Sequence, residues 1–343
     1  MSSPDAYRPT LHRFTLGQAD VTTILDGAHI REPINPPFAM DKSEGEIAAI
    51  AHTNNLPTNG FENTYTPTVI TVGGKTVLFD TGFGAMERDN GAGNLVRRLG
   101  LGGYAPEDID VVAFTHCHPD HIAGVMEGDK PTFPNARYAI GRREYDAWND
   151  GSEIPAQRQQ NRNMFLKLIP PLAEKMTFLE DGDAVVAGLT AEAAFGHSLG
   201  HMMYRLESDN KSLLVWGDVT NHYVFSLQYP DSTVGFDDDK DVAIASRKRV
   251  LDMVATDRLL VSGHHMPFPS IGYVERNGDS YRWTPASYQL RMSNQAGGLA
   301  TSRPTMRRAI GATISTAGNA TIQLEYHARN HVAGRSPDSR NGC

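Results

Sequence analysis

The sequence predicts an α/β protein in which strands and helices are arranged in layers. Three observations support this fold class. Short segments rich in β-branched residues are closed by Gly, Asn or Asp, segments with helical spacing lie between them, and the pattern occurs in two successive halves. Strands that alternate with helices are typical of sheets covered by helices. Since 343 residues can bury a large core, we expect one domain over residues 1–326 and a poorly ordered tail over residues 327–343.

In the first half, the expected elements follow one another closely. They are strands at residues 19–27, 65–72 and 75–82, a short helix at 93–100, a strand at 108–116, a helix from Pro119 or Asp120, a strand running into a helix at 136–148, and a helix at 157–169. The strand at 108–116 is expected to be buried, because its apolar core VVAF is continuous rather than alternating. The helix after it can begin at Pro119, because proline is tolerated in a first helical turn.

The second half is expected to form a second sheet. Its successive strands are predicted at residues 176–180, 184–195, 202–208 and 211–218. Residues 237–255 are predicted to be a helix, with acids in its first turn and bases further on, and we interpret its charges as a solvated face. Residues 258–265 repeat the pattern of an apolar strand that ends on histidine.

Composition and charge argue against several classes of partner. The formal net charge of −8 opposes binding to phosphate backbones, and no stripe of Lys or Arg overrides it, so no nucleic acid is expected. No apolar run is long enough for a bilayer, so no membrane is expected either. The first residues carry no basic stretch followed by an apolar one, which predicts a cytoplasmic protein unless a secretory leader was removed. Cys117 and Cys343 are too few for a disulfide framework, and Cys117 is expected to pack in the core.

Several apolar strands end on a side chain that can bind a metal ion or orient such a ligand. These strand-end residues are Asp80, His116, Asp218 and either His264 or His265, and the segment AFGHSLGH adds His197 and His201. Strand ends in α/β sheets gather at one edge, where active sites tend to form. Taken singly, His197 could be an ordinary core histidine and Asp218 a turn-forming aspartate. Their convergence favours a shared site.

The segment THCHPDH, residues 115–121, carries the most specific signal. His116 and His118 lie two apart on extended chain, so both imidazoles can point to one side. Asp120 and His121 begin the next helix and project at different angles, which suits two metal ions better than one. Imidazole and carboxylate together favour zinc or a similar divalent ion. The alternative is a solvated, histidine-rich loop.

In this order, the residues of THCHPDH, His197, Asp218 and the final histidine pair resemble the metallo-β-lactamase superfamily of dinuclear metal hydrolases. The resemblance runs from about Phe14 to Tyr288 and, through the segment HMPFP, is greatest to the methyl parathion hydrolase and lactonase group. It implies a four-layer αβ/βα sandwich with two central mixed sheets flanked by helices. It also implies two divalent metal ions, and zinc is the metal expected for both.

The resemblance implies a role for each residue of the site. A first metal site is implied for His116, His118 and His197, and a second for Asp120, His121 and His265, with Asp218 bridging the two. Asp80 and His201 are expected to orient the ligands rather than bind metal. His265 is chosen as the last ligand because it precedes an apolar residue and PFP, and His264 would then pack beside it.

The chemistry implied by the resemblance is hydrolysis. Two zinc ions carry +4, and Asp120, Asp218 and a bridging hydroxide remove about three charges, leaving about +1 to stabilise an oxyanion. The hydroxide is expected to attack carbon or phosphorus, and Asp120 to pass its proton to the leaving group. We expect a lactone or aryl ester as substrate. An organophosphate triester is the alternative, and a non-catalytic metal-binding module is a remote one.

Aromatic and apolar side chains are expected to form a pocket for a small, apolar, uncharged substrate. The residues expected to line it are Trp148, Phe165, Met266 and Phe268. Trp148 and Phe165 could equally pack in the core, since Phe165 lies at helical spacing with Leu168. A homodimer is implied only by the resemblance.

Overall fold

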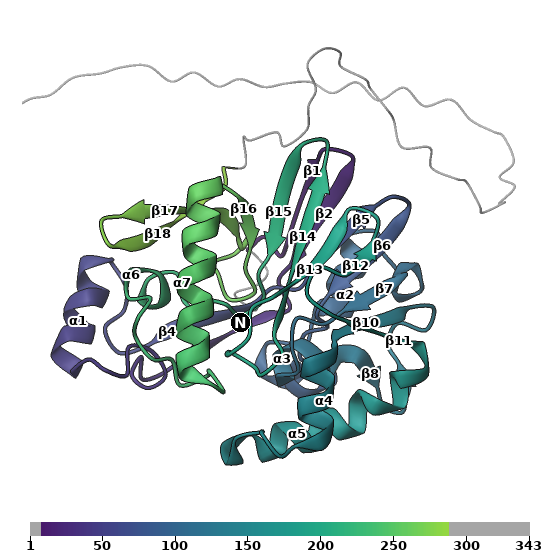
Figure 1. The fold of residues 1–343 in the computed structure, drawn as a ribbon, viewed down its shortest axis with the longest axis horizontal. Coiled ribbons are helices and arrows are strands. Elements are labelled where there is room, and N and C mark those ends of the chain that lie inside the picture. The colour runs from purple at the N-terminus through teal and green to yellow at the C-terminus, as the bar shows by residue number, and fades with distance from the viewer. Residues whose placement is uncertain (1–7, 288–343) are drawn as a thin grey trace, which may run out of the picture. The chain divides into compact units, whose positions relative to one another are not determined.

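Two seven-stranded sheets form the centre of the protein (Figure 1). The computed structural model describes residues 8–287. The expected end of the domain at residue 326 and the expected tail at 327–343 lie outside the described residues.

The first sheet is mixed. Its strands, in spatial order, are β1 (Leu11–Leu16), β2 (Ala19–Ile24), β5 (Thr68–Val72), β6 (Lys75–Phe79), β7 (Val111–Ala113), β10 (Arg137–Gly141) and β11 (Met176–Leu179). Pairs from β1 to β6 are antiparallel, and pairs from β6 to β11 are parallel. The assignment of residues 176–180 to the second sheet is wrong, because β11 pairs with β10. A parallel pair needs a long crossover, which α4 (Arg142–Asp150) and α5 (Gln159–Leu168) supply.

The second sheet is also mixed. Its strands, in spatial order, are β12 (Ala184–Val186), β13 (Leu189–Ala193), β14 (Met202–Ser208), β15 (Lys211–Val215), β16 (Leu260–Ser262), β17 (Ile271–Asn277) and β18 (Ser280–Pro285). All neighbours are antiparallel except β15 and β16. Residues 184–195, predicted as one strand, form two, because the chain turns at Gly188, whose φ of 85° suits glycine. The sequence prediction lacks the hairpin of β17 and β18.

Helices and two short ribbons complete the described chain. The remaining α-helices are α1 (Glu44–Thr53), α2 (Leu95–Leu101), α3 (Pro119–Ile122), α6 (Phe225–Gln228) and α7 (Lys240–Asp257). The 3₁₀ helices are η2 (Gly84–Asn90), η3 (Pro106–Asp108), η4 (Ala123–Val125), η5 (Ala156–Arg158) and η6 (Pro170–Lys175). The ribbons pair β3 (Gly27–Arg31) with β4 (Phe61–Tyr65), and β8 (Met126–Glu127) with β9 (Lys130–Pro131). Between residues 8 and 287, no helix has the length and apolar character that crossing a membrane requires.

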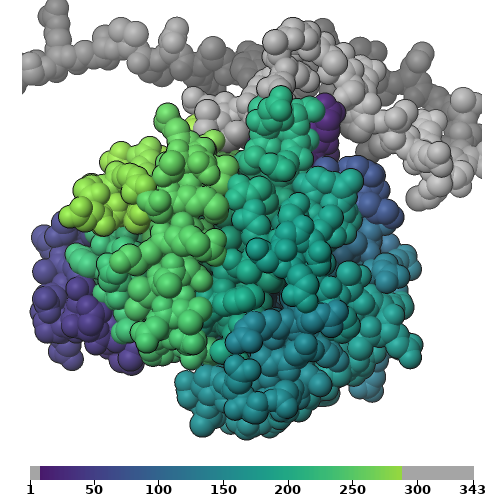
Figure 2. Space-filling model, in the orientation of Figure 1, coloured from purple at the N-terminus to yellow at the C-terminus, as the bar shows by residue number. Residues whose placement is uncertain are grey.

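The apolar side chains fall into the layers that the sequence predicts. One core, which includes Phe79, Tyr204 and Leu213, lies between the two sheets. A second lies between the first sheet and helices α2, α4 and α5, and a third lies between the second sheet and α7. The order of layers is therefore helices, sheet, sheet and helix, as expected. On the face drawn in Figure 2, the atoms of α7 lie beside those of the β13 to β15 segment.

The buried hydroxyl of Tyr204 joins the two sheets. It donates a hydrogen bond at 2.6 Å to the carbonyl oxygen of Phe114, which directly follows β7. Tyr204→Phe should lower the free energy of unfolding by about 1–3 kcal/mol, because a buried carbonyl loses this donor. Chemical denaturation measures the change. Tyr273→Phe, at a partly exposed position in β17, is the control and should change stability by less than about 0.5 kcal/mol. Equal effects of the two substitutions would contradict this prediction.

Candidate metal centre

Histidines and aspartates from the loops after five strands meet in one buried cluster. The loops follow β6, β7, β13, β15 and β16, and they carry Asp80, residues 115–121, residues 197–201, Asp218 and residues 264–265. Within this cluster, three groups of side chains place one nitrogen or oxygen atom from each member within 4.8 Å of the others. Each of the seven ligands predicted from the sequence belongs to at least one of these groups. The structure therefore brings the predicted site together.

The first group consists of His116, His118 and His197. Nδ1 of His118 lies 3.0 Å from Nε2 of His197. The ring of His116 is centred 4.5 Å from that of His118 and 4.7 Å from that of His197. His116 and His118 project to the same side of the extended chain, as their spacing predicts.

Asp218 lies between the first group and a second group, which consists of Asp120, His121, His264 and His265. Its Oδ2 is 3.3 Å from Nε2 of His197 and 2.9 Å from Nε2 of His265, while its Oδ1 is 3.4 Å from Nε2 of His121. Oδ2 of Asp120 lies 3.5 Å from Nε2 of His121 and 3.4 Å from Nε2 of His265. Asp218 is thus placed to contact ions at both groups.

Several atoms of the cluster face inward without a hydrogen-bond partner in the described chain. In the described part of the chain, Nε2 of His116, Nε2 of His121 and Oδ1 of Asp218 are buried and form no hydrogen bond. Buried polar atoms are normally paired, so exceptions need an explanation. Inward-facing imidazole nitrogens beside carboxylates are the donor set that zinc prefers. The residues present therefore fit the binding of divalent metal.

The surroundings decide which imidazoles are neutral. Burial, and then the neighbouring histidines, hold the pKa of His116 well below its usual value. Burial and the charge of Arg158 lower the pKa of His118 to about 4. Burial acts in the same direction on His121, but Asp218 and Asp120 raise its pKa well above the usual value. His116 and His118 can therefore offer lone pairs at neutral pH, whereas a cation at His121 must displace a proton.

Asp80 and His201 lie behind the candidate ligands. Oδ2 of Asp80 accepts hydrogen bonds from Nδ1 of His121 at 2.8 Å and from the hydroxyl of Thr115 at 2.9 Å. The same hydroxyl is 3.0 Å from Nδ1 of His116, so both rings turn Nε2 toward the centre. Nε2 of His201 accepts the backbone N–H of Asp218 at 3.0 Å. These contacts suit the orienting role that the resemblance implies for Asp80 and His201.

The two final histidines are held differently. Nδ1 of His265 donates to the carbonyl oxygen of Thr64 at 2.8 Å, and its Nε2 faces the centre, where it donates to Oδ2 of Asp218 at 2.9 Å. The ring of His264 contacts that of His121 at a tilt of 35°, with centroids 4.1 Å apart, and its buried Nε2 has no hydrogen-bond partner in the described chain. His264 also belongs to the group of Asp120, His121 and His265. Both histidines therefore lie within reach of the centre, and His265 as the last ligand stays a prediction.

Glu144 is a residue of the site that sequence reasoning misses. Its buried carboxylate accepts hydrogen bonds from the backbone N–H of Cys117 and the indole N–H of Trp148, at 2.7 and 2.8 Å. It also accepts from the hydroxyl of Ser198 and the N–H of Gly200, at 2.6 and 2.8 Å. One side chain in α4 therefore fixes both histidine-bearing loops. Cys117 itself packs in the core, as the sequence predicts.

Three of the four residues expected to line a substrate pocket lie in the core instead. Trp148, Phe165 and Met266 are all completely buried, and none of them lines either of the two cavities beside the cluster. Trp148 and Phe165 pack between α4, α5 and the first sheet, which is the alternative that their helical spacing allowed. Met266 packs under the second sheet. Phe268 does line a cavity.

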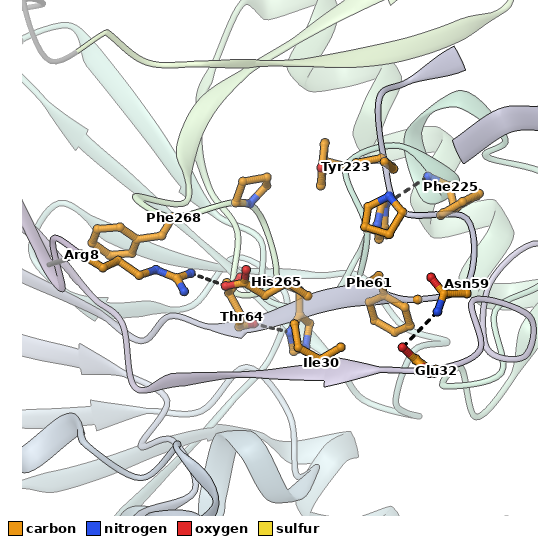
Figure 3. Close-up of a pocket in the computed structure, with 16 residues that line it drawn as sticks. Arg8, Ile30, Glu32, Asn59, Phe61, Thr64, Tyr223, Phe225, His265 and Phe268 are labelled. Atoms are coloured by element: carbon orange, nitrogen blue, oxygen red, sulfur yellow. Dashed lines mark hydrogen bonds and ion pairs between the residues drawn. The ribbon is translucent and has the colours of Figure 1, made fainter. Parts of the chain in front are cut away.

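Two cavities meet at His265. The smaller, of about 190 Å³, covers the cluster, and its polar lining includes Arg31, Tyr65, Asp120 and Arg158. The larger, of about 540 Å³, has a mostly apolar wall (Figure 3). That wall includes Ile30, Leu56, Phe61, Tyr223, Phe225 and Phe268. Apart from Phe268, sequence reasoning misses this wall, because β3, β4 and the segment around α6 contribute to it jointly.

The family of the chain follows from comparison with known proteins. The sequence model of the metallo-β-lactamase superfamily matches residues 64–264, which is more than half of the 343 residues. The chain therefore belongs to the metallo-β-lactamase superfamily, as the resemblance implies, and its four layers are those of the metallo-β-lactamase fold.

Individual relatives of the chain share only part of its length and have low sequence identity to it. The chain is 27% identical to an N-acyl homoserine lactonase of Bacillus cereus over 165 residues, 48% of this chain and 58% of that protein. It is 25% identical to an N-acyl homoserine lactonase of a Bacillus species over 174 residues, 50% of this chain and 60% of that protein. The chain thus spans less than two thirds of the length of these curated relatives.

Solved structures are similar over a greater length. AidC, a dizinc quorum-quenching lactonase in complex with a product, superposes with a TM-score of 0.75 and 25% identity, covering 82% of this chain and 98% of that one. The hydrolase AbOPH superposes with a TM-score of 0.75 and 24% identity, covering 82% of this chain and 99% of that one, and this similarity concerns the fold alone.

Zinc added to the metal-free protein should raise its thermal stability. At a free zinc concentration 100 times the Kd of one site, the gain is about 2.7 kcal/mol if the ion binds only the folded chain. His116→Ala should reduce this gain, because His116 belongs to two of the three groups. His52→Ala, on the exposed side of α1, is the control. Thermal unfolding with and without zinc measures the gain, and an undiminished gain in His116→Ala would contradict the site.

Proposed function

We propose that the chain is a metal-dependent hydrolase that opens a lactone or cleaves an ester carrying an apolar acyl group. The observation that carries this proposal is the meeting of the candidate metal centre with a larger apolar cavity at His265. The names of the relatives add a substrate class, the N-acyl homoserine lactones. Such compounds join a small polar lactone to an apolar acyl chain, which matches the two cavities.

Two divalent cations, with zinc as the expected metal, are proposed to bind in this centre. The proposed ligands are His116, His118 and His197 for the first ion, Asp120, His121 and His265 for the second, and Asp218 for both. When bound, such cations activate water and polarise a substrate carbonyl. Asp80 and His201 are proposed to orient these ligands.

Asp120 is the proposed catalytic residue. It lines the smaller cavity, and its side chain is 17% exposed, compared with 3% for Asp218. Burial opposes its ionisation, but His121 and His265 hold the pKa of Asp120 well below its usual value. The carboxylate is therefore ionised at neutral pH, and its exposure to the smaller cavity supports the proposal that it relays a proton to the leaving group.

The larger cavity is proposed to hold the apolar part of the substrate. Its volume of about 540 Å³ lies within the range of about 300–1,000 Å³ common for small-molecule sites. Ile30 and Phe61 from the β3 and β4 ribbon face Tyr223 and Phe225 across it (Figure 3). Each methylene buried there contributes about 0.8 kcal/mol, so the cavity favours longer acyl chains.

An organophosphate triester is the alternative substrate, because attack on phosphorus needs the same centre. The cytoplasmic location and the homodimer stay predictions.

A kinetic panel on metal-replete protein tests the function. N-acyl homoserine lactones should be hydrolysed with a higher kcat/KM than aryl esters or a phosphotriester. His116→Ala should lower turnover by roughly a hundredfold or more, because the centre supplies several kcal/mol. Bound metal without hydrolysis of any of these compounds would indicate a metal-binding module instead.

The proposed role of the larger cavity, as the site of the acyl chain, can be tested at Ile30. Ile30 lines the cavity from β3 and is 71% exposed, so Ile30→Asp should not disturb folding. It should lower the ratio of kcat/KM for long over short acyl chains by about tenfold, the loss of roughly two buried methylenes. Leu101→Asp, at a 66% exposed position in α2, is the matched control and should leave the ratio unchanged. An unchanged ratio in Ile30→Asp would place the acyl chain elsewhere.

A further inference from the structure

The acidic run Asp237, Asp238 and Asp239 lies directly before α7. Interpreted from the sequence, its charges belong to a solvated face. That interpretation is wrong for the first two residues, because the side chain of Asp237 is 1% exposed and that of Asp238 is fully buried. Only Asp239 does what the helix pattern predicts, since its carboxylate caps α7 by accepting the N–H of Val242 at 3.2 Å.

Asp237 and Asp238 each hold a different histidine of the first group. Nδ1 of His197 donates to Oδ1 of Asp237 at 2.9 Å. Nε2 of His118 donates to Oδ2 of Asp238 at 3.2 Å. In both rings, the bonded nitrogen is the one that points away from the centre.

The second oxygen of each carboxylate accepts from an arginine. Oδ2 of Asp237 is 2.7 Å from Nη2 of the buried Arg247, and Oδ1 of Asp238 is 2.7 Å from Nε of Arg158. Arg158 also donates to the carbonyl oxygen of Phe236. A buried carboxylate without such a partner is costly. Each aspartate therefore remains an acceptor for its histidine while its charge is balanced locally.

The backbone keeps this arrangement in register. The N–H of Asp238 donates to the carbonyl oxygen of His197 at 3.0 Å, and the N–H of Asp239 donates to that of Gly196 at 2.9 Å. The acidic run is thus bonded along the loop that carries His197. The backbone next to both carboxylates is therefore tied to that loop.

We propose that Asp237 and Asp238 are positioning residues for the first metal site, each fixing the tautomer of one histidine while an arginine balances its charge. An imidazole that donates from one nitrogen has its lone pair on the other. Nδ1 of His118 and Nε2 of His197, 3.0 Å apart, then both carry lone pairs. Two lone pairs at this distance repel each other unless a cation lies between them. The inference rests on the proposed metal centre and not on its substrate.

The first metal site differs from the second group in how the charge of its orienting carboxylates is balanced. Asp80, which holds His121, accepts from Thr115 and forms no ion pair with an arginine in the described chain. A carboxylate whose charge is uncompensated raises the basicity of the imidazole bonded to it more strongly. The first site should therefore keep or gain zinc affinity when Arg158 is removed and lose affinity when Asp238 is removed.

Variants that break the same ion pair from its two sides test this proposal. Asp238→Ala removes the acceptor and should weaken zinc binding at the first site by about 10-fold to 100-fold. Arg158→Met breaks the same pair but keeps the acceptor, so zinc affinity should stay equal or rise. Competition of the metal-free protein with a chromogenic chelator measures both affinities. Arg282→Met, which breaks the exposed pair with Glu275 in the β17 and β18 hairpin, is the control.

A double variant adds a rescue. In Asp238→Asn, the amide can accept from His118 only by turning its own N–H groups toward Arg158, where donors face donors. Asp238→Asn should therefore weaken zinc binding. The double variant Asp238→Asn with Arg158→Met removes the clash of donors and should bind zinc with an affinity within about tenfold of the parent. Tenfold is the limit because it is the smallest loss of affinity expected when the acceptor is missing. This pair of variants also decides the question if Asp238→Ala does not fold.

A spectroscopic signature separates positioning from a merely structural role. In the cobalt(II)-loaded parent, the ring N–H protons of His118 and His197 should give paramagnetically shifted NMR signals that exchange slowly with water. Asp238→Ala should remove one of these signals and leave the other. Parent-like zinc affinity with both signals retained, or equal losses of affinity in Asp238→Ala and Arg158→Met, would overturn the proposal. A parent that binds neither zinc nor cobalt would overturn the metal centre as well.

Discussion

The compensation of buried charge is the constraint on which this centre depends. Asp218 is only 2% exposed, and its carboxylate contacts His121, His197 and His265. A carboxylate with so little water around it needs donors or positive charge close by. The loops after β7, β13 and β16 supply those partners, while Asp218 itself follows β15. A shift of either sheet against the other would therefore leave buried charge uncompensated.

Carboxylates further from the centre hold the loops in place. Asp80 fixes the segment that begins at Thr115, and Glu144 ties the same segment to the loop of His197. Asp237 holds that loop from its other side. Because these acceptors are themselves hydrogen-bonded or paired, the inward-facing nitrogens are positioned before any cation binds. The same contacts explain why the centre combines residues from both sheets.

Local patterns predicted most of the centre, and they failed where distant segments meet. His116 and His118 follow from the alternation of side chains on extended chain, and Asp218 follows from its place at the end of a strand. The partner of β11 could not be predicted, because a short apolar strand carries no record of its neighbour in the sheet. Trp148 has the same helical spacing whether it faces the core or a pocket, and the packing of α4 decides for the core.

The sequence by itself determined the layered α/β class, the superfamily and the set of histidines and aspartates that meet. It could do so because spacing, strand ends and motif order are properties of short segments. Only the tertiary structure decided that Asp237 and Asp238 turn inward to His197 and His118, and that an apolar cavity opens beside His265. Burial and hydrogen bonding at those places depend on segments that are distant in the sequence. Around the cavity, for example, β4 and α6 are more than a hundred residues apart. No local sequence pattern records such contacts.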